Sequence, residues 1–385
     1  MTPEYVEHLV ELGLADRSDD GRFPEATIRV LMLLRQLDLA GLPLKGIARL
    51  VADGEFSLDF IEVVGSDAFA PYGDRTFAEE SERSGVPVEL LMTLREATGG
   101  LTPEPGDRMR DDELAIVPLL AFWVRGGFRP VIIERTLRVY GDSLRRIAET
   151  DGEWWRSEIQ ERMFSEGKTE IDLAAYAREN TPKLAQLSDR TILSIYHAHQ
   201  RHVWGANIVS GLATALVRRG LHVQTERLPA ICFLDMTGYT RLTAERGDSA
   251  AAALAEQVGR VVARTSVAHG GRPVKWLGDG VMLYFPEAGP AVHAALGMVE
   301  GVAAAGLPPA HVGLHSGPVL FQEGDYYGLT VNVASRIGEY ARPGEVLVSQ
   351  EVVDASTGSD LSFREIGPVE LKGVAGVVHL HQAMR

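Results

Sequence analysis

The sequence changes character near residue 228, and this change constrains the fold more than any other feature. Before it, apolar residues recur at helical spacing, broken by Gly and Pro, and strand-like runs are few. After it, short β-rich runs alternate with helical segments, beginning with an apolar run at 229–235 and a helical pattern at 241–269. The 385 residues are enough for two or three domains with separate cores. We expect an all-α region at 1–201, a linker at 202–227 and an α+β domain at 228–385.

The α+β domain has the order strand, long helix, hairpin, helix, strand, helix and trailing strands. This order predicts a ferredoxin-like βαββαβ core with additions. The hairpin covers 272–285 and turns at Gly278, Asp279 and Gly280. Asp235 ends the first strand, and it meets Asp279 if the hairpin lies beside that strand. A carboxylate pair of this kind suits Mg²⁺ or Mn²⁺, whereas Asp279 alone is ordinary turn chemistry.

A second candidate site is the turn that follows the first strand and precedes the helical segment. Its residues are Thr237, Gly238, Tyr239 and Thr240. Free backbone amides at a helix N-terminus favour anions, so this turn is predicted to bind a triphosphate. Further along the chain, Asn332 and Arg336 lie four residues apart on a predicted helix and therefore share one of its faces.

From about residue 228 to the C-terminus the chain resembles the class III nucleotidyl cyclase family. Six positions match the polar signature of that family: Asp235, Lys275, Asp279, Asp325, Asn332 and Arg336. The resemblance implies an adenylate cyclase that converts ATP to 3′,5′-cyclic AMP and pyrophosphate. The link at 316–324 is short and lacks the arginine of larger members, which is typical of the compact bacterial subgroup.

The resemblance also implies a role for each position. Asp235 and Asp279 would hold two divalent cations, Mg²⁺ or Mn²⁺, with the backbone carbonyl of Met236 as a further ligand. Asn332 would orient the ribose, and Arg336 would stabilise charge on the reacting phosphate.

Base recognition is assigned by the same resemblance to Lys275 and Asp325, and the terminal phosphates to Lys372. Hydrogen-bonding chemistry supports the assignment of these two residues to adenine, because adenine offers an amino donor for a carboxylate and a ring nitrogen acceptor for an ammonium. Guanine reverses both groups, so ATP is the predicted substrate. In this family the metal-binding and base-reading residues belong to opposite subunits, which implies a C2 homodimer with two equivalent sites.

Composition limits the other classes of function. The formal charge of −15 argues against nucleic-acid and anionic-membrane partners. The longest apolar run, 115–124, is too short to span a bilayer, and the N-terminus lacks the features of a signal peptide, so we expect a cytoplasmic protein. The single cysteine, Cys232, lies within the predicted first strand and is expected to have a packing role.

The helical region contains a faint internal repeat, in which 20–60 aligns with 106–146 at an offset of 86 residues. The first copy also resembles helix-turn-helix repressors of the MerR kind, and three explanations stay open: a chance likeness, a sensor or packing module, and DNA reading. His197, His199 and His202 fall on different sides of a helix, which argues against a metal site. The apolar run at 119–124 either lines a cavity for an apolar ligand or packs in a core.

We expect the helical region to regulate the α+β domain by setting how two copies of that domain meet. The hypothesis is motivated by about 200 residues of helical sequence that carry no catalytic signature. Two alternatives differ in class: a non-catalytic nucleotide-binding sensor and a helix-turn-helix DNA-binding regulator.

Overall fold

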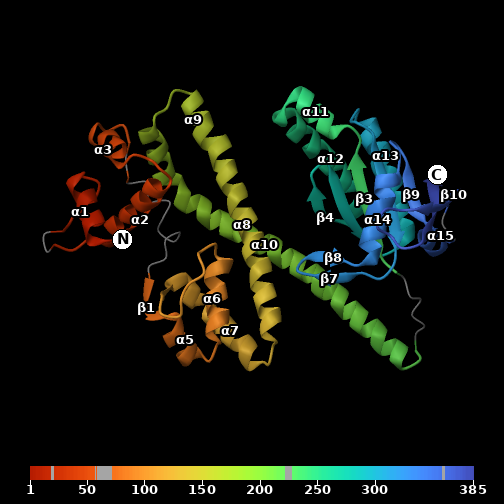
Figure 1. Cartoon of the computed structure of the whole chain (residues 1–385), viewed down its shortest axis with the longest axis horizontal. Helices are drawn as coiled ribbons and strands as arrows, with labels where there is room; N and C mark the ends of the chain where they lie inside the picture. The colour runs from red at the N-terminus through yellow and green to blue at the C-terminus, as the bar shows by residue number, and fades with distance from the viewer. Residues whose placement is uncertain (19–20, 57, 59–71, 222–227, 358–359) are drawn as a thin grey trace. The chain divides into compact units, whose positions relative to one another are not determined.

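The computed structural model describes residues 1–385 except 19–20, 57, 59–71, 222–227 and 358–359 (Figure 1). The chain forms two compact units, Met1–Leu212 and Ala213–Arg385. Within the described ranges, none of the helices combines the length and the apolar character that crossing a membrane requires.

The first unit begins with three helices, α1 (Pro3–Glu11), α2 (Glu25–Leu39) and α3 (Leu44–Ala52). Leu9, Leu14 and Leu34 are buried in the small core that these helices share. Gly41 turns the chain between α2 and α3 with a φ of 82°, a conformation that glycine adopts without a steric penalty.

The next part of the first unit contains a small sheet as well as helices. Its elements are β1 (Tyr72–Thr76), α5 (Phe77–Ser84), α6 (Val88–Ala97), β2 (Arg108–Arg110), α7 (Asp111–Arg125) and α8 (Pro130–Trp155). β1 and β2 pair antiparallel. A buried ion pair joins Arg95 to Glu113 at 2.8 Å. The prediction of a mostly helical region is confirmed, and the two short strands are an addition to it.

A π-helical turn (Arg156–Glu161) and α9 (Arg162–Ser165) lead into α10 (Glu170–Arg218). This helix is 49 residues long and continues through Pro182. The predicted domain boundary at 201/202 therefore falls inside a continuous helix, and the division into 1–201, 202–227 and 228–385 stays a prediction. His197, His199 and His202 are exposed on α10. Among the residues that the structure describes, no cluster of three or more histidine, cysteine or acidic side chains could hold a metal ion.

The second unit is built on a seven-stranded sheet with the order β10-β11-β9-β6-β3-β5-β4. Its strands are β3 (Ala230–Met236), β4 (Arg272–Leu277), β5 (Gly280–Phe285), β6 (Ala310–Ser316), β9 (Val346–Ser349), β10 (Ser362–Glu370) and β11 (Val377–Met384). β6 and β9 are parallel, and the other neighbours are antiparallel. A separate hairpin is formed by β7 (Leu320–Gln322) and β8 (Asp325–Tyr327).

In the described part of this unit the sheet is accompanied by α11 (Tyr239–Arg246), α12 (Asp248–Ala268), α13 (Ala288–Ala304), α14 (Leu329–Tyr340) and α15 (Gln350–Ala355). Alternate residues of β3 point to opposite faces of the sheet. Cys232 and Leu234 pack into the core that α12 and α13 cover, whereas Ile231 and Phe233 pack on the other face with residues of β8 and α14. This arrangement confirms the predicted α+β cyclase-type core, and Cys232 is fully buried in it.

Candidate functional site

The structure brings the two predicted metal-binding carboxylates together at the end of β3. β3 pairs with β5 up to Leu234, which lies opposite Val281. Because the hairpin turn comes next, a Cβ at Gly280 would lie only 3.2 Å from Asp235 Oδ1. Burial, and then the negative charge of Asp279, raise the pKa of the Asp235 carboxyl. The two side chains are thus near enough to repel each other, and a divalent cation between them would relieve that repulsion.

Met236 and the turn after it surround this carboxylate pair. The backbone amide of Met236 donates to the Asp235 side chain, and the side chain of Met236 is buried. The Thr237 amide donates to the Pro309 carbonyl oxygen at 3.0 Å. Gly238 precedes α11 with a φ of 81°, the left-handed conformation that glycine favours.

The remaining two residues of the predicted phosphate turn belong to the first turn of α11. The hydroxyl of Tyr239 donates to the Ala251 carbonyl oxygen at 3.1 Å, so this side chain packs α11 against α12. Thr240 is part of the helix, and its side chain lies outside the described residues. The Thr237 amide and the Tyr239 hydroxyl therefore already have protein partners.

Sequence reasoning missed His311, which lies directly across from Asp235 on the neighbouring strand β6. Its Nε2 is 3.7 Å from Asp235 Oδ2, and its Nδ1 is 3.3 Å from the hydroxyl oxygen of Thr237. The His311 side chain is only 13% exposed, whereas that of Asp235 is 50% exposed. The signal that would have revealed it is the pairing register of β3 and β6, which the sequence pattern alone does not supply.

The two predicted base-reading residues lie side by side. Lys275 on β4 forms an ion pair with Asp325, the first residue of β8, and their side chains are 38% and 21% exposed. The Tyr326 amide donates to Asp325 Oδ1 at 2.8 Å. The ring of Tyr326 stacks on Tyr284 of β5 at a centroid distance of 4.5 Å, which fixes β8 against the β4-β5 hairpin.

Asn332 and Arg336 project from the outer face of α14. The inner face of this helix is buried and packs on the sheet; its residues are Val333, Ala334, Ile337 and Gly338. The approach is close, since a Cβ at Gly313 of β6 would lie 2.0 Å from the Gly338 amide nitrogen. Asn332 is exposed, and Arg336 forms an ion pair with Glu339 on the same outer face. Neither residue points into the sheet on which Asp235 lies.

Lys372 lies in the exposed turn that follows β10. The residue before it, Leu371, is buried in the same small core as Ile337 of α14. The turn is therefore anchored beside α14, and the lysine side chain is exposed to solvent.

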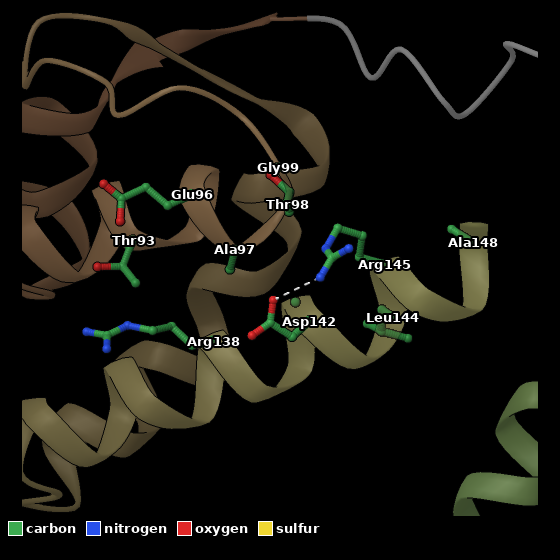
Figure 2. A pocket seen from close by; sticks show the side chains of 11 residues that line it. Thr93, Glu96, Ala97, Thr98, Gly99, Arg138, Asp142, Leu144, Arg145 and Ala148 are labelled. Carbon is green, nitrogen blue, oxygen red and sulfur yellow. Dashed lines mark ion pairs between the residues drawn. The ribbon is translucent and has the colours of Figure 1, made fainter. Parts of the chain in front are cut away.

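The first unit, Met1–Leu212, is called the helical unit from here on, and it contains a cavity of about 630 Å³ between α6 and α8 (Figure 2). Its lining includes Glu96, Arg138 and Arg145, and Asp142 forms an ion pair with Arg145 at 3.6 Å. The predicted apolar run at 119–124 does not line this cavity. Leu120 and Ala121 of that run are buried in the core of the unit, while Leu119 and Phe122 are exposed. The apolar ligand stays a prediction.

Comparison with known proteins connects this geometry to a family. A model of the adenylate and guanylate cyclase catalytic domain matches residues 222–383. A pH-sensitive adenylate cyclase of Mycobacterium tuberculosis is 30% identical over 318 residues, which cover 80% of this chain and 77% of that protein. An adenylate cyclase of Streptomyces coelicolor is 28% identical over 273 residues, which cover 70% of this chain and 68% of that protein.

Among solved structures, the adenylyl cyclase CyaB of P. aeruginosa is 24% identical to this chain. The match covers 42% of this chain and 97% of the CyaB chain, with a TM-score of 0.36. The chain belongs to the class III adenylate and guanylate cyclase family.

Proposed function

We propose that the chain converts ATP to 3′,5′-cyclic AMP and pyrophosphate at two equivalent sites, each shared between two copies of the chain. The observation that supports this best is the division of the polar residues within one chain. Asp235 and Asp279 converge at the sheet, whereas Asn332 and Arg336 point outward from α14. Groups that point in different directions in one molecule can be brought together by a second molecule related to it by a twofold axis.

The carboxylate pair fits a divalent-cation site. Two divalent cations, Mg²⁺ or Mn²⁺, would be held by Asp235 and Asp279 together with the Met236 carbonyl, and they would neutralise the triphosphate and acidify the attacking 3′ hydroxyl. Two carboxylates are few for a closed protein site, but they suffice for a cation that also takes oxygens from substrate phosphates. Burial first, and then the negative charge of Asp279, raise the pKa of Asp235, and a cation beside the carboxylate would offset both effects.

Base selection is assigned to Lys275 and Asp325. They already contact each other, so the base would be read by a preassembled donor and acceptor rather than by two separate side chains. The carboxylate would accept from the amino group of adenine, and the ammonium would donate to a ring nitrogen. Guanine would place a donor against the ammonium and an acceptor against the carboxylate. A mismatch of this kind costs several kcal/mol, or about 10³-fold in rate, when the groups are desolvated.

The remaining residues would align the substrate. Asn332 would orient the ribose of a nucleotide held by the partner copy, and Arg336 would neutralise charge on the α-phosphate. Arg336 must first exchange its ion pair with Glu339 for the phosphate, which is a small cost at a half-exposed position. Lys372 and the backbone amides of Gly238, Tyr239 and Thr240 at the start of α11 are the candidates for the terminal phosphates, whereas the Thr237 amide already donates to Pro309.

The helical unit is proposed to control the rate by setting how two catalytic units meet. The mycobacterial relative, which is named as pH-sensitive, matches 80% of this chain, and that share exceeds the catalytic unit alone. α10 is a single helix from Glu170 to Arg218, so a rotation at one of its ends reaches the other. The cytoplasmic location stays a prediction.

The direct test is product formation by the full-length protein with Mn²⁺ and either ATP or GTP. We expect cyclic AMP from ATP at a rate at least about 10³-fold above that of cyclic GMP from GTP. Faster production of cyclic GMP would overturn the base assignment. A wild-type protein that makes neither product, under conditions in which it binds Mn²⁺-ATP, would favour a non-catalytic sensor.

A further inference from the structure

His311 lies against the candidate metal site although the cyclase signature does not include it. The antiparallel register of β3 and β6 places its side chain on the same face of the sheet as that of Asp235. Nε2 of the ring is 3.7 Å from Asp235 Oδ2. This is longer than a hydrogen bond, so the contact between the imidazole and the carboxylate is a close approach rather than a bond.

The other ring nitrogen is also engaged. Nδ1 lies 3.3 Å from the Thr237 hydroxyl oxygen, and Thr237 is in turn tied to the start of β6 by the bond from its amide to Pro309. A hydroxyl that donates to Nδ1 leaves the ring proton on Nε2, where it faces a carboxylate acceptor. The opposite tautomer would place a lone pair on Nε2 against the Asp235 oxygens, which is unfavourable.

Asp235 is thereby surrounded on several sides by fixed groups. The Met236 amide donates to its carboxylate, Oδ1 lies beside the backbone at Gly280, and Oδ2 faces the largely buried imidazole. The side chain is nevertheless half exposed, so part of the carboxylate stays open to solvent beside Asp279. Such an arrangement leaves a lone pair for a cation and restricts the rotation of the carboxylate group.

We propose that His311, oriented by the Thr237 hydroxyl, is a positioning residue that holds the Asp235 carboxylate for divalent-cation binding. This inference rests on the proposed function, because it takes Asp235 to be a metal ligand. His311 contacts neither nucleotide nor cation in this proposal, and it acts through Asp235. Residues in this relation to a metal ligand change metal affinity by about 10- to 100-fold when they are removed.

Direct titration of the full-length protein with Mn²⁺, followed by electron paramagnetic resonance of the free ion, tests the proposal. Asp235→Ala defines which part of the bound Mn²⁺ belongs to this site. His311→Leu should bind Mn²⁺ at that site about 10-fold more weakly or worse, while His311→Gln, which keeps an N–H donor, should recover most of the affinity. His293→Leu is the matched control, because His293 pairs with Asp360 at 3.2 Å elsewhere in the same unit, and it should bind as the wild type does.

Steady-state kinetics add a second readout. The Mn²⁺ concentration for half-maximal cyclase rate should rise in His311→Leu, whereas the rate at saturating Mn²⁺ should stay close to that of the wild type. A purely structural defect would lower the maximal rate without moving the Mn²⁺ dependence. Thr237→Val should shift the Mn²⁺ dependence in the same direction, since it removes the hydroxyl that orients the ring.

Several results would overturn the proposal. Wild-type Mn²⁺ affinity in a folded His311→Leu variant would do so, as would a nitrogen coupling in the Mn²⁺ spectrum that shows an imidazole bound directly to the ion. If His311→Leu does not fold, as judged by thermal unfolding, Thr237→Val carries the test, and unchanged affinity in that variant overturns it. If Asp235→Ala itself leaves Mn²⁺ binding unchanged, the metal site of the proposed function fails, which is distinct from failure of His311 alone.

Discussion

Complementation between two inactive variants tests the division of the site most sharply. Asp235→Ala removes a carboxylate at the end of β3, and Arg336→Ala removes a cation from the outer face of α14. Each homodimer then carries the lesion in both of its sites. Loss of a single group that stabilises the charge of a transition state costs about 10²- to 10³-fold in rate, so both variants should be nearly inactive alone.

The expected recovery follows from counting sites. In a freely exchanging equimolar mixture, about half of the dimers pair one variant with the other. If each site takes its carboxylates from one chain and its arginine from the other, a mixed dimer has one site with both lesions and one intact site. One intact site in half of the dimers, against two in every wild-type dimer, gives about a quarter of the wild-type rate per chain.

Production of cyclic AMP from ATP and Mn²⁺ is the assay, with differently tagged variants mixed so that the fraction of mixed dimers in the unfractionated sample is quantified. The matched control is a mixture of Asp235→Ala with Asp279→Ala, in which both lesions lie in the same half-site, and it should recover nothing. Mixed dimers of Asp235→Ala with Arg336→Ala that stay as inactive as their parents would refute the shared site. Recovery in the Asp235→Ala and Asp279→Ala mixture would refute the assignment of both carboxylates to one half-site.

Three further predictions concern stability and regulation. Gly313→Ala should lower the free energy of unfolding by about 1–3 kcal/mol in denaturant titration, because the added Cβ would meet the backbone of α14. Gly289→Ala is the control, since a Cβ there meets nothing within 4 Å, and it should leave the free energy of unfolding nearly unchanged. Asp235→Asn should abolish activity yet raise the melting temperature at neutral pH, because a raised pKa means that the ionised Asp235 carboxylate disfavours the folded state. The difference in melting temperature from the wild type should shrink as the pH falls through that raised pKa. Equal melting temperatures of the two proteins at neutral pH would contradict this prediction. Inserting two alanines after Gly205 should rotate the rest of α10 by about 200°, whereas inserting four rotates it by about 40° beyond a full turn. The two-residue insertion should therefore change the cyclase rate more than the four-residue insertion. Equal rates for the wild type and both insertions would argue against control through this helix.

Much of the catalytic unit could be predicted from the sequence because the decisive contacts are local. Asp279 lies in a two-strand hairpin whose turn is marked by two glycines, and the apolar run that ends at Asp235 is a strand by composition. Once the hairpin pairs with that strand, the two carboxylates meet with little freedom left. The shared face of Asn332 and Arg336 likewise follows from helical spacing within α14.

Contacts between segments far apart in the sequence were not predictable in the same way. Thr237 and His311 are separated by 74 residues, and their contact depends on the exact register of β3 against β6. A slip of one residue in that register would turn His311 to the other face of the sheet. The pairing of β1 with β2 and the continuation of α10 through Pro182 are also set by tertiary context rather than by local pattern.

The packing of α14 explains physically why one chain divides its polar residues between two directions. A Cβ at Gly313 would lie 2.0 Å from the Gly338 amide, so helix and strand are in contact with no room for a ligand between them. The inner face of α14 is thus committed to the core, and functional side chains on this helix can serve only what lies beyond its outer face. Asp235 belongs to the sheet beneath and keeps its own open side. If the polar residues on the outer face of α14 serve a nucleotide held by a second copy, as proposed above, activity would depend on that copy, and an element that changes how the copies meet would change the rate.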